Sequence, residues 1–213
     1  SQNADATSVL FDGVTGAGMS LATLFATEDR IDHALDVAGL GLVRVNAGNI
    51  YVTTNSGSIQ RGIDPASSGD TVNVNDGSYD AQVSINKTIT LISANGSTVT
   101  TIQDSSPISG LGTIQVIGPT TGVQIGDSGR GFTINGIDSP NPGIEWAAVY
   151  FQGNHTNATV IGNHIIAAGD AGLMTEFSPV IDTMTVSENE FAGQTFIGPT
   201  PADLGFGNQF TVW

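Results

Sequence analysis

Between residues 57 and 96 the spacing of hydrophobic positions changes from a helical period to a period of two. Ile59 and Ile63 lie four residues apart, which places both side chains on one face of a short helix. Pro65 ends that helix, because proline has no backbone N–H and clashes with the preceding turn. Apolar and polar residues then alternate in 71–74, 82–85 and 89–91, which predicts three short strands separated by turns.

Residues 1–56 follow a different pattern, and we expect them to form a leader segment of mixed helix and strand. The spacing of leucine, phenylalanine, isoleucine and alanine from Met19 to Ala38 predicts a helix or a broken helix. Shorter apolar stretches at 8–13, 42–45 and 49–52 predict strands, the last two as a hairpin or as two sides of one coil. The chain is thus divided into a leader, 1–56, and a second region, 57–213.

A repeat with a period close to 27 residues runs through the last third of the chain. Three segments share the pattern apolar-x-x-Asn-x-apolar, centred on Asn135, Asn163 and Asn189, and Val212 follows Val186 by 26 residues. Such spacing predicts a solenoid whose coils stack about 4.8 Å apart and bury a continuous core. The asparagines are expected to form a ladder at one corner. Two inner lines are expected, one of Phe132, Val160 and Val186, the other of Ile137, Ile165 and Phe191.

The short helix, the stretch Gly69-Asp70-Thr71-Val72 and the stretch Val83-Ser84-Ile85-Asn86-Lys87 together resemble the N-terminal cap and first coil of right-handed parallel β-helix proteins. These proteins form the pectin-lyase-like superfamily, which includes pectate lyases, pectin methylesterases and many surface proteins. Over residues 57–213 the resemblance implies an all-β, right-handed parallel β-helix solenoid with a short N-terminal cap helix. Residues 1–56 would precede it as the mixed leader.

The catalytic motifs of the superfamily do not carry over to this sequence. It lacks the calcium-binding aspartate cluster with a basic partner, the paired aspartates of the esterases and the Gly-His-Gly of the polygalacturonases. Arg130 and Lys87 lie within the expected coils, but neither stands near a suitable acidic pair. Glu188 and Glu190 share a strand face and are expected to form a solvated edge. We therefore predict no catalytic residues, no enzyme activity and, from His33, His155 and His164, no zinc site.

The charge balance limits the partners further. The chain has 20 acidic and 5 basic residues, a net charge of −15, and no cysteine. Such a surface repels nucleic acids and anionic membranes, and no apolar stretch is long enough to cross a bilayer. No cofactor is identified. Calcium is a possible metal ligand, because Asp70, Asn73, Asn75, Asp76 and Asp80 supply oxygen atoms around one turn.

These features predict an extracellular structural module of a surface adhesin, sheath or filament. The expected fourth repeat stops at Trp213, which would leave an apolar edge for another copy, or for an adjacent tandem repeat, to cover head to tail. The candidate interface residues are Phe11, Leu21, Phe25, Phe210, Val212 and Trp213. The alternative is a secreted protein that binds or degrades polysaccharide, including cell-surface glycans, for which Trp146, Tyr150 and Phe151 supply an aromatic cluster.

Overall fold

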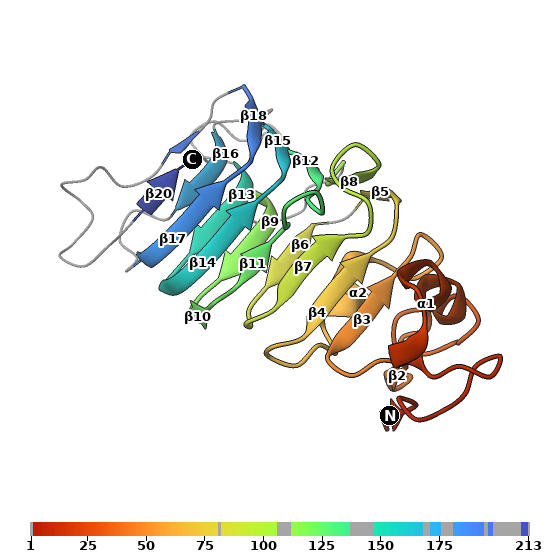
Figure 1. Ribbon diagram of the computed structural model, residues 1–213. Helices are drawn as coiled ribbons and strands as arrows, with labels where there is room; N and C mark the ends of the chain where they lie inside the picture. The colour runs from red at the N-terminus through yellow and green to blue at the C-terminus, as the bar shows by residue number, and fades with distance from the viewer. Residues whose placement is uncertain are drawn as a thin grey trace.

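Parallel strands stacked into three sheets make up most of the molecule (Figure 1). The computed structural model describes residues 2–80, 82–105, 112–136, 147–167, 171–175, 181–193, 196–197 and 210–212. Within the three sheets every strand pairing of these residues is parallel. The predicted all-β fold, a solenoid of parallel strands, is confirmed.

The chain visits the three sheets in turn, so neighbouring strands of a sheet come from successive coils. The first sheet contains β3 (Asn49–Val52), β4 (Thr71–Val74), β7 (Thr90–Ser93), β10 (Thr120–Thr121), β11 (Gln124–Ile125), β14 (His155–Ile161), β17 (Ile181–Ser187) and β20 (Phe210–Val212). The second contains β5 (Gly77–Asp80), β8 (Thr100–Gln103), β12 (Thr133–Asn135), β15 (His164–Ile166) and β18 (Glu190–Ala192). The third contains β6 (Val83–Ile85), β9 (Gly112–Ile117), β13 (Ala147–Gln152), β16 (Ala171–Thr175) and β19 (Phe196–Ile197).

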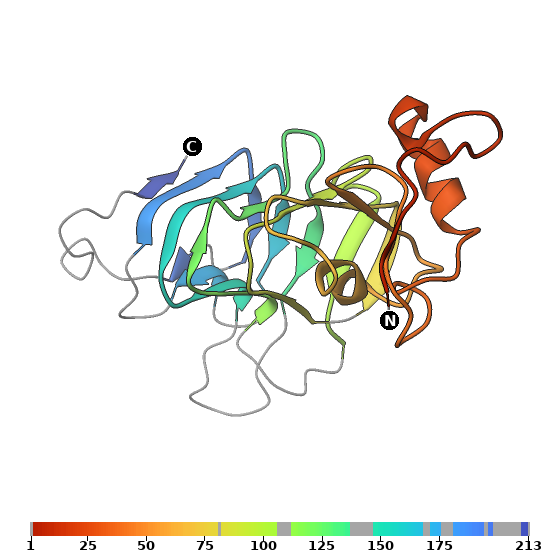
Figure 2. The ribbon, with the colours of Figure 1, turned by 90° about the horizontal axis from the view of Figure 1, so that it is seen from below.

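The hydrophobic core lies between the sheets, as the alternation of apolar and polar residues predicts. Figure 2 shows the stack from below, with the leader at one end. In the first sheet Val72, Leu91, Ile125, Val160 and Val186 follow one another in register, and all five side chains are buried. The backbone of Val212 continues this line beside Val186. The 26-residue spacing therefore does mark stacked coils.

The predicted asparagine ladder is correct for two positions and wrong for the third. His164 pairs with Glu190, which places Asn163 beside Asn189. Thr133, however, pairs with His164, so the residue beside Asn163 is Phe132, three positions before Asn135. The six-residue glycine-rich turn 126–131 precedes Phe132 and makes this corner, whereas Gly162 alone precedes Asn163 at the next one.

The two predicted lines of stacked core side chains also differ in register from the prediction. Phe132 is buried but does not stack on Val160, whose neighbour in the preceding coil is Ile125. Ile165 does lie beside Phe191, while its neighbour on the other side is Ile134. Ile137, predicted at that place, lies outside the described residues.

The leader contains one α-helix, α1 (Leu21–Glu28), in place of the helix or broken helix predicted over 19–38. The Ser20 side chain caps its first turn by accepting a hydrogen bond from Thr23 N–H. The helix stops at Glu28, and the Asp29 side chain accepts hydrogen bonds from Thr53 Oγ1 and Asn55 Nδ2 instead. A single 3₁₀ turn, η1 (Gly16–Gly18), precedes α1.

The leader strands belong to two different sheets. β2 (Val43–Arg44) pairs with β1 (Ala4–Asp5), whereas β3 pairs with β4 of the first sheet. Residues 42–52 therefore do not form a hairpin. In the predicted strand at 8–13 only Phe11 makes an isolated bridge, to Val14. Among the described residues no helix combines the length and the apolar character needed to cross a membrane.

The expected boundary at residue 56 runs through a continuous core. Leu35, Leu42, Ile50 and Val52, all before that boundary, are buried in the same hydrophobic cluster as the strands that follow. The second helix, α2 (Ile59–Ile63), adds Ile59 and Ile63 to it. Whether the leader also completes the stack of a neighbouring copy stays a prediction.

Candidate functional site

The N-terminal end of the stack concentrates most of the side chains that make specific polar contacts. Here β3, β5 and β6 are the first strands of the three sheets, and an unprotected first strand exposes backbone N–H and C=O groups. Side chains from α2, β2 and the leader lie against two of these edges. We call this region, residues 2–64 with Lys87, the N-terminal cap.

A glutamine closes the edge of the third sheet. Gln60 of α2 lies beside β6, where its Oε1 accepts from Ser84 N–H at 2.7 Å and its Nε2 donates to Ser84 C=O at 3.2 Å. A primary amide carries one acceptor and one donor group side by side, as a peptide does. Gln60 therefore pairs with Ser84 as a neighbouring strand would.

An arginine covers the edge of the first sheet. Arg44 of β2 donates to the backbone oxygen of Asn49, the first residue of β3, at 3.3 Å. Its other terminal nitrogen binds Asp70 Oδ2 at 2.7 Å, which anchors the guanidinium where both partners are mostly buried. The leader turn above this edge is fixed by Arg61, which donates twice to Ala34 C=O, and Leu35 beside it is completely buried.

The only lysine of the chain is also part of the cap. Lys87 Nζ donates to the backbone oxygens of Ile63, Asp64 and Ala66 at 2.9 to 3.2 Å, where α2 ends. A helix end leaves such carbonyl groups without intrahelical partners, and a cation there also complements the helix dipole. Lys87 thus satisfies the end of α2 from the following coil.

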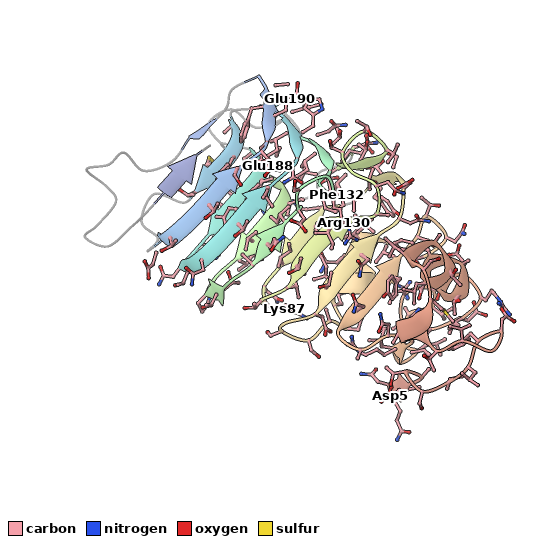
Figure 3. The ribbon with its side chains drawn as sticks, in the orientation of Figure 1. Asp5, Lys87, Arg130, Phe132, Glu188 and Glu190 are labelled. Atoms are coloured by element: carbon pink, nitrogen blue, oxygen red, sulfur yellow. The ribbon has the colours of Figure 1, made fainter. Side chains whose placement is uncertain are left out.

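Arg130, the remaining basic residue considered for catalysis, is also committed to the fold. Its Nε donates to Ser93 C=O at 2.9 Å and its Nη2 to Asn73 Oδ1 at 3.0 Å. The fifth cation, Arg30, pairs with Asp12 on the surface at 2.9 Å. Figure 3 labels Lys87 and Arg130 on the stack together with Glu188 and Glu190, and no ion pair joins them among the described residues.

One buried cluster brings together the ligand types that a metal ion would need. Glu28, His33 and Asp36 lie within 4.8 Å of one another. Val43 N–H donates to His33 Nδ1 at 3.0 Å, and a backbone N–H can only donate. The ring proton therefore resides on Nε2, which faces Glu28 Oε1 at 2.8 Å, and no lone pair is left there for a metal. The cluster fits a structural hydrogen-bond network and fits a metal ion poorly.

Burial raises the pKa of Glu28, and the hydrogen bond from His33 opposes that rise. Asp36 contributes differently, since its Oδ2 accepts the His33 backbone N–H at 3.1 Å. The cluster joins the end of α1, the turn that contains Leu35 and the strand β2. It therefore holds the leader in the conformation that covers the core.

The three aspartates among the residues proposed to bind calcium are each engaged by a different partner. Asp70 accepts from Arg44 and from Ser67 N–H, and both oxygens of Asp76 accept from Asn95 Nδ2. Asp80 accepts from the backbone N–H and the hydroxyl of Ser105, and these bonds lower the pKa of Asp80. Calcium binding stays a prediction, without a common site among these residues.

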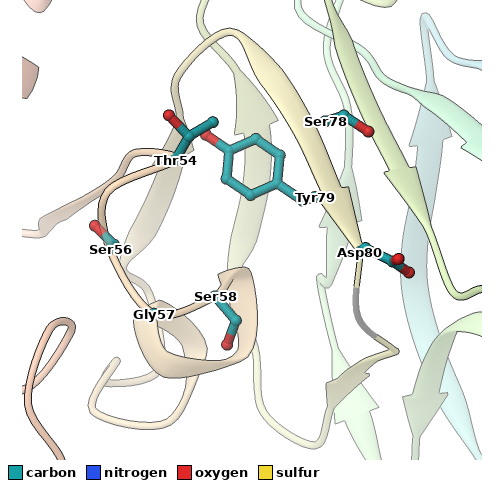
Figure 4. A pocket seen from close by; sticks show the side chains of 7 residues that line it. All are labelled: Thr54, Ser56, Gly57, Ser58, Ser78, Tyr79 and Asp80. Carbon is teal, nitrogen blue, oxygen red and sulfur yellow. The ribbon is translucent and has the colours of Figure 1, made fainter. Parts of the chain in front are cut away.

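A small polar cavity of about 120 Å³ lies between the loop before α2 and β5 (Figure 4). Its lining is formed by Thr54, Ser56, Gly57, Ser58, Ser78, Tyr79 and Asp80. Tyr79 is mostly buried and donates to Asn75 C=O at 2.9 Å, and burial raises its pKa. The volume suits about four water molecules. No histidine, lysine or arginine lines the cavity to serve as a base beside its hydroxyl groups.

The predicted interface residues of the leader lie together, but largely inside the molecule. Phe25 of α1 is only 3% exposed and packs edge-to-face on Tyr51, with ring centroids 5.6 Å apart. Phe11 and Leu21 are partly buried against the same cluster. Phe25 therefore offers no exposed surface to a second molecule. The side chains of Phe210 and Val212, and the whole of Trp213, lie outside the described residues.

Sequence reasoning missed the apolar residues that the cap does expose. Of the large hydrophobic side chains exposed among the described residues, all but Val99 belong to the leader. They are Val9, Leu10, Val14, Val37 and Leu40. The turn Asp12-Gly13, with both residues at positive φ, separates Val14 from the first two. The turn itself could be found in the sequence, but the exposure of its neighbours could not, because Phe11 beside it packs against a buried cluster.

The other end of the stack differs. Among the described residues β18, β19 and β20 are the last strands of the three sheets. Glu188 and Glu190 are exposed there, as the expectation of a solvated edge requires. The histidines lie apart: His33 in the cap, His164 beside Glu190, and His155 buried against Phe151 and Thr120.

Comparison of the chain with protein-family models, with curated proteins and with solved structures finds no match.

Proposed function

We propose that this chain is a structural module of an extracellular surface protein, such as an adhesin, a sheath or a filament. In this proposal the coils of this chain form one stretch of a longer β-solenoid. The partner is a second copy or an adjacent tandem repeat. The module serves as a mechanical element and a spacer, and it catalyses no reaction.

The contrast between the two ends of the stack carries the proposal. At the N-terminal end Gln60, Arg44 and Leu35 occupy places that a further coil would take. At the other end, within the described part of the chain, β18, β19 and β20 have a strand on one side only. Solenoids need a dedicated cap where the stack begins and bury new surface wherever it continues. Covering the second end with the partner would protect its strand edges and bury apolar surface.

The use of the basic residues supports a role without catalysis. A lyase of this type needs an arginine or a lysine free to remove a proton. Lys87 binds three carbonyl groups and Arg130 binds Ser93 and Asn73, so both are held by the fold. Glu188 and Glu190 have no basic residue paired with them among the described residues.

We also infer a distant membership of the pectin-lyase-like superfamily. Three parallel sheets, a helix that covers the first coil and paired corner asparagines at 163 and 189 support it. The right-handed winding belongs to the same inference.

A head-to-tail contact would bring the strand edges of one copy onto the cap of the next. Leu10 and Leu40 are the two exposed leucines of the cap, and covering them would favour association because it buries apolar surface. Such a contact is heterologous and propagates into a rod instead of closing.

Negative-stain electron microscopy combined with light scattering tests this proposal. We expect the chain to form rods at high concentration and moderate salt, which screens the charge of −15. The double substitution Leu10→Asp and Leu40→Asp should abolish the rods, whereas Val99→Asp, at an exposed valine outside the cap, should leave them intact. A chain that stays monomeric at every concentration and salt would overturn the proposal.

A further inference from the structure

Four asparagines of the chain stand in the pattern Asn-x-Ser or Asn-x-Thr, which is the acceptor sequence for N-linked glycans in secreted proteins. They are Asn86, Asn95, Asn154 and Asn157. All four are exposed. Of the nine other asparagines that the structure describes, only Asn3 and Asn55 are exposed. Exposure therefore distinguishes the asparagines of the acceptor pattern from most of the others.

The exposed asparagines outside the pattern use their side chains to hold the fold. Asn3 Oδ1 accepts from Leu42 N–H at 2.9 Å, and Asn55 Nδ2 donates to Asp29 Oδ2 at 3.0 Å. The Asn86 side chain, in contrast, makes no hydrogen bond to another described residue. The described part of the fold therefore does not use the amide group of Asn86, and its nitrogen lies open to solvent.

Two of the four acceptor asparagines have a structural reason of their own. Asn95 Nδ2 donates to both carboxylate oxygens of Asp76 at 3.0 Å. Asn157 has a φ of 54°, in the left-handed region that asparagine tolerates better than most residues. Asn86 and Asn154 do not have positive φ. The case for a modification therefore rests on Asn86 and Asn154.

Asn86 and Asn154 lie at the same corner of the stack, where the chain passes from the third sheet to the first. Asn86 lies between β6 and β7, and Asn154 lies between β13 and β14. Four residues after Asn86 and five after Asn154, Thr90 and Thr159 both pair with Gln124. Because β11 lies between β7 and β14 in the sheet, the two corners are two strand spacings, or roughly 10 Å, apart. Figure 1 shows the starts of β7 and β14 along one edge of this sheet.

The position of this edge is compatible with the proposed assembly. No acceptor sequence lies in the leader, and none lies on β18, β19 or β20. A bulky, hydrated group attached along the edge would therefore leave the two ends of the stack without an attached sugar. The same group would prevent the edge from packing against another protein.

We propose that Asn86 and Asn154 carry N-linked glycans, and that the edge between the third and first sheets faces solvent in the assembled protein. The modification rests on the extracellular placement in the proposed function, because it belongs to secreted proteins. The co-reactant is a lipid-linked sugar diphosphate, and a transferase supplies the base. The asparagine Nδ2 forms a bond to the anomeric carbon of the sugar and loses one proton to that base. The bond from the anomeric carbon to the diphosphate oxygen breaks, and the lipid diphosphate leaves.

Peptide mapping by mass spectrometry, on the full chain recovered from its native source, tests the two sites directly. Peptide N-glycosidase removes a glycan and leaves aspartate in place of asparagine, and heavy-oxygen water labels that aspartate. We expect the label at Asn86 and Asn154. Asn95 and Asn157 are the internal comparison and should stay unlabelled.

Secretion from a eukaryotic host allows matched variants to be compared by intact mass. Asn86→Gln and Asn154→Gln should each lower the mass by one glycan, and the double variant should carry none. Asn55→Gln, at an exposed asparagine outside the acceptor pattern, should keep both glycans. Thr88→Ser keeps the hydroxyl group of the acceptor sequence and should keep the glycan on Asn86.

A chain that reaches the cell surface with Asn86 and Asn154 both unmodified would overturn the inference and leave the structural role intact. Label at Asn95 or Asn157 in place of these two residues would also overturn it. A chain that carries both glycans but forms no rods under the conditions given above would remove the structural role and leave the two sites established.

Discussion

The first coil and the middle coils of the stack are stabilised by different groups. In the middle, backbone ladders join each strand to the next, and buried polar side chains such as Asn163 and Ser93 donate to backbone carbonyl groups of a neighbouring coil. In the first coil, side chains take the place of a missing neighbour: Gln60 beside β6, Arg44 beside β3 and Lys87 at the end of α2. Continuing a parallel stack needs only a repeated pattern, whereas beginning one needs a particular side chain at each exposed edge.

The first prediction asks whether the leader belongs to the core as fully as a middle strand does. Leu35 of the leader and Leu91 of β7 are both completely buried in the same cluster. Leu35→Ala and Leu91→Ala should each lower the free energy of unfolding by about 3 kcal/mol, through lost burial and the cavity left behind. Urea denaturation measures both. Leu40→Ala, at an exposed leucine, is the control and should change stability by less than about 0.5 kcal/mol.

The second prediction concerns the corner asparagine of the middle coils. Asn163 Oδ1 accepts from Phe132 N–H, and its Nδ2 donates to Ile125 C=O, both at 3.0 Å. Asn163→Ala leaves these buried backbone groups without partners and should cost about 2 to 3 kcal/mol. Thermal unfolding checks this against Asn86→Ala, an exposed asparagine at another corner. Equal stability of the two variants would show that the ladder contributes nothing.

The third prediction tests the side chain that replaces a strand. Gln60→Leu removes both hydrogen bonds to Ser84 and should cost about 1 to 2 kcal/mol. Gln60→Glu keeps the acceptor but places a second oxygen against Ser84 C=O, so it should be destabilising at neutral pH and partly recover in acid. Recovery follows because a protonated carboxyl group can donate again. An identical pH profile for the glutamate variant and the unsubstituted chain would contradict the assignment.

The smallest predicted effect is the pH dependence that the cap gives to the free energy of unfolding. Burial raises the pKa of Glu28 above its ordinary value of 4.5, so the folded chain keeps this proton to higher pH than the unfolded chain does. The stability contributed by the protonated form is present below pH 4.5 and is lost as the pH rises through the raised pKa.

Glu28→Gln should therefore remove this decline from a plot of unfolding free energy against pH. The exposed Asp12→Asn, which also removes one carboxylate, should retain the decline. If both variants follow the unsubstituted chain, the buried carboxyl group does not set the pH response.

How far the fold could be predicted differs between the same two regions. The middle coils repeat, so alternation and spacing located β4, β7 and the line from Val160 to Val186 correctly. Spacing failed where one coil has a longer turn, because residues 126–131 shift Asn135 by three positions relative to Asn163. A repeat pattern fixes the order of coils but carries no information on the length of a turn between them.

The cap could not be predicted, since its contacts join residues far apart in the chain. The pairs Gln60 with Ser84 and Arg44 with Asp70 are separated by 24 and 26 residues, about one coil, and no repeated residue pattern marks them in the sequence. The apolar residues of 19–38 do have helical spacing, but α1 covers only Leu21–Glu28. Leu35 lies after this helix, and its side chain is buried in the core.

Amide hydrogen exchange at Ser84, followed residue by residue with NMR, tests most directly whether side chains close the first coil. Ser84 lies on the first strand of the third sheet, and its N–H is bound by Gln60 Oε1. If the edge is closed, Ser84 N–H should exchange as slowly as the N–H of Gln115 inside the sheet and should lose that protection in Gln60→Leu. Fast exchange at Ser84 in the unsubstituted chain would contradict the account.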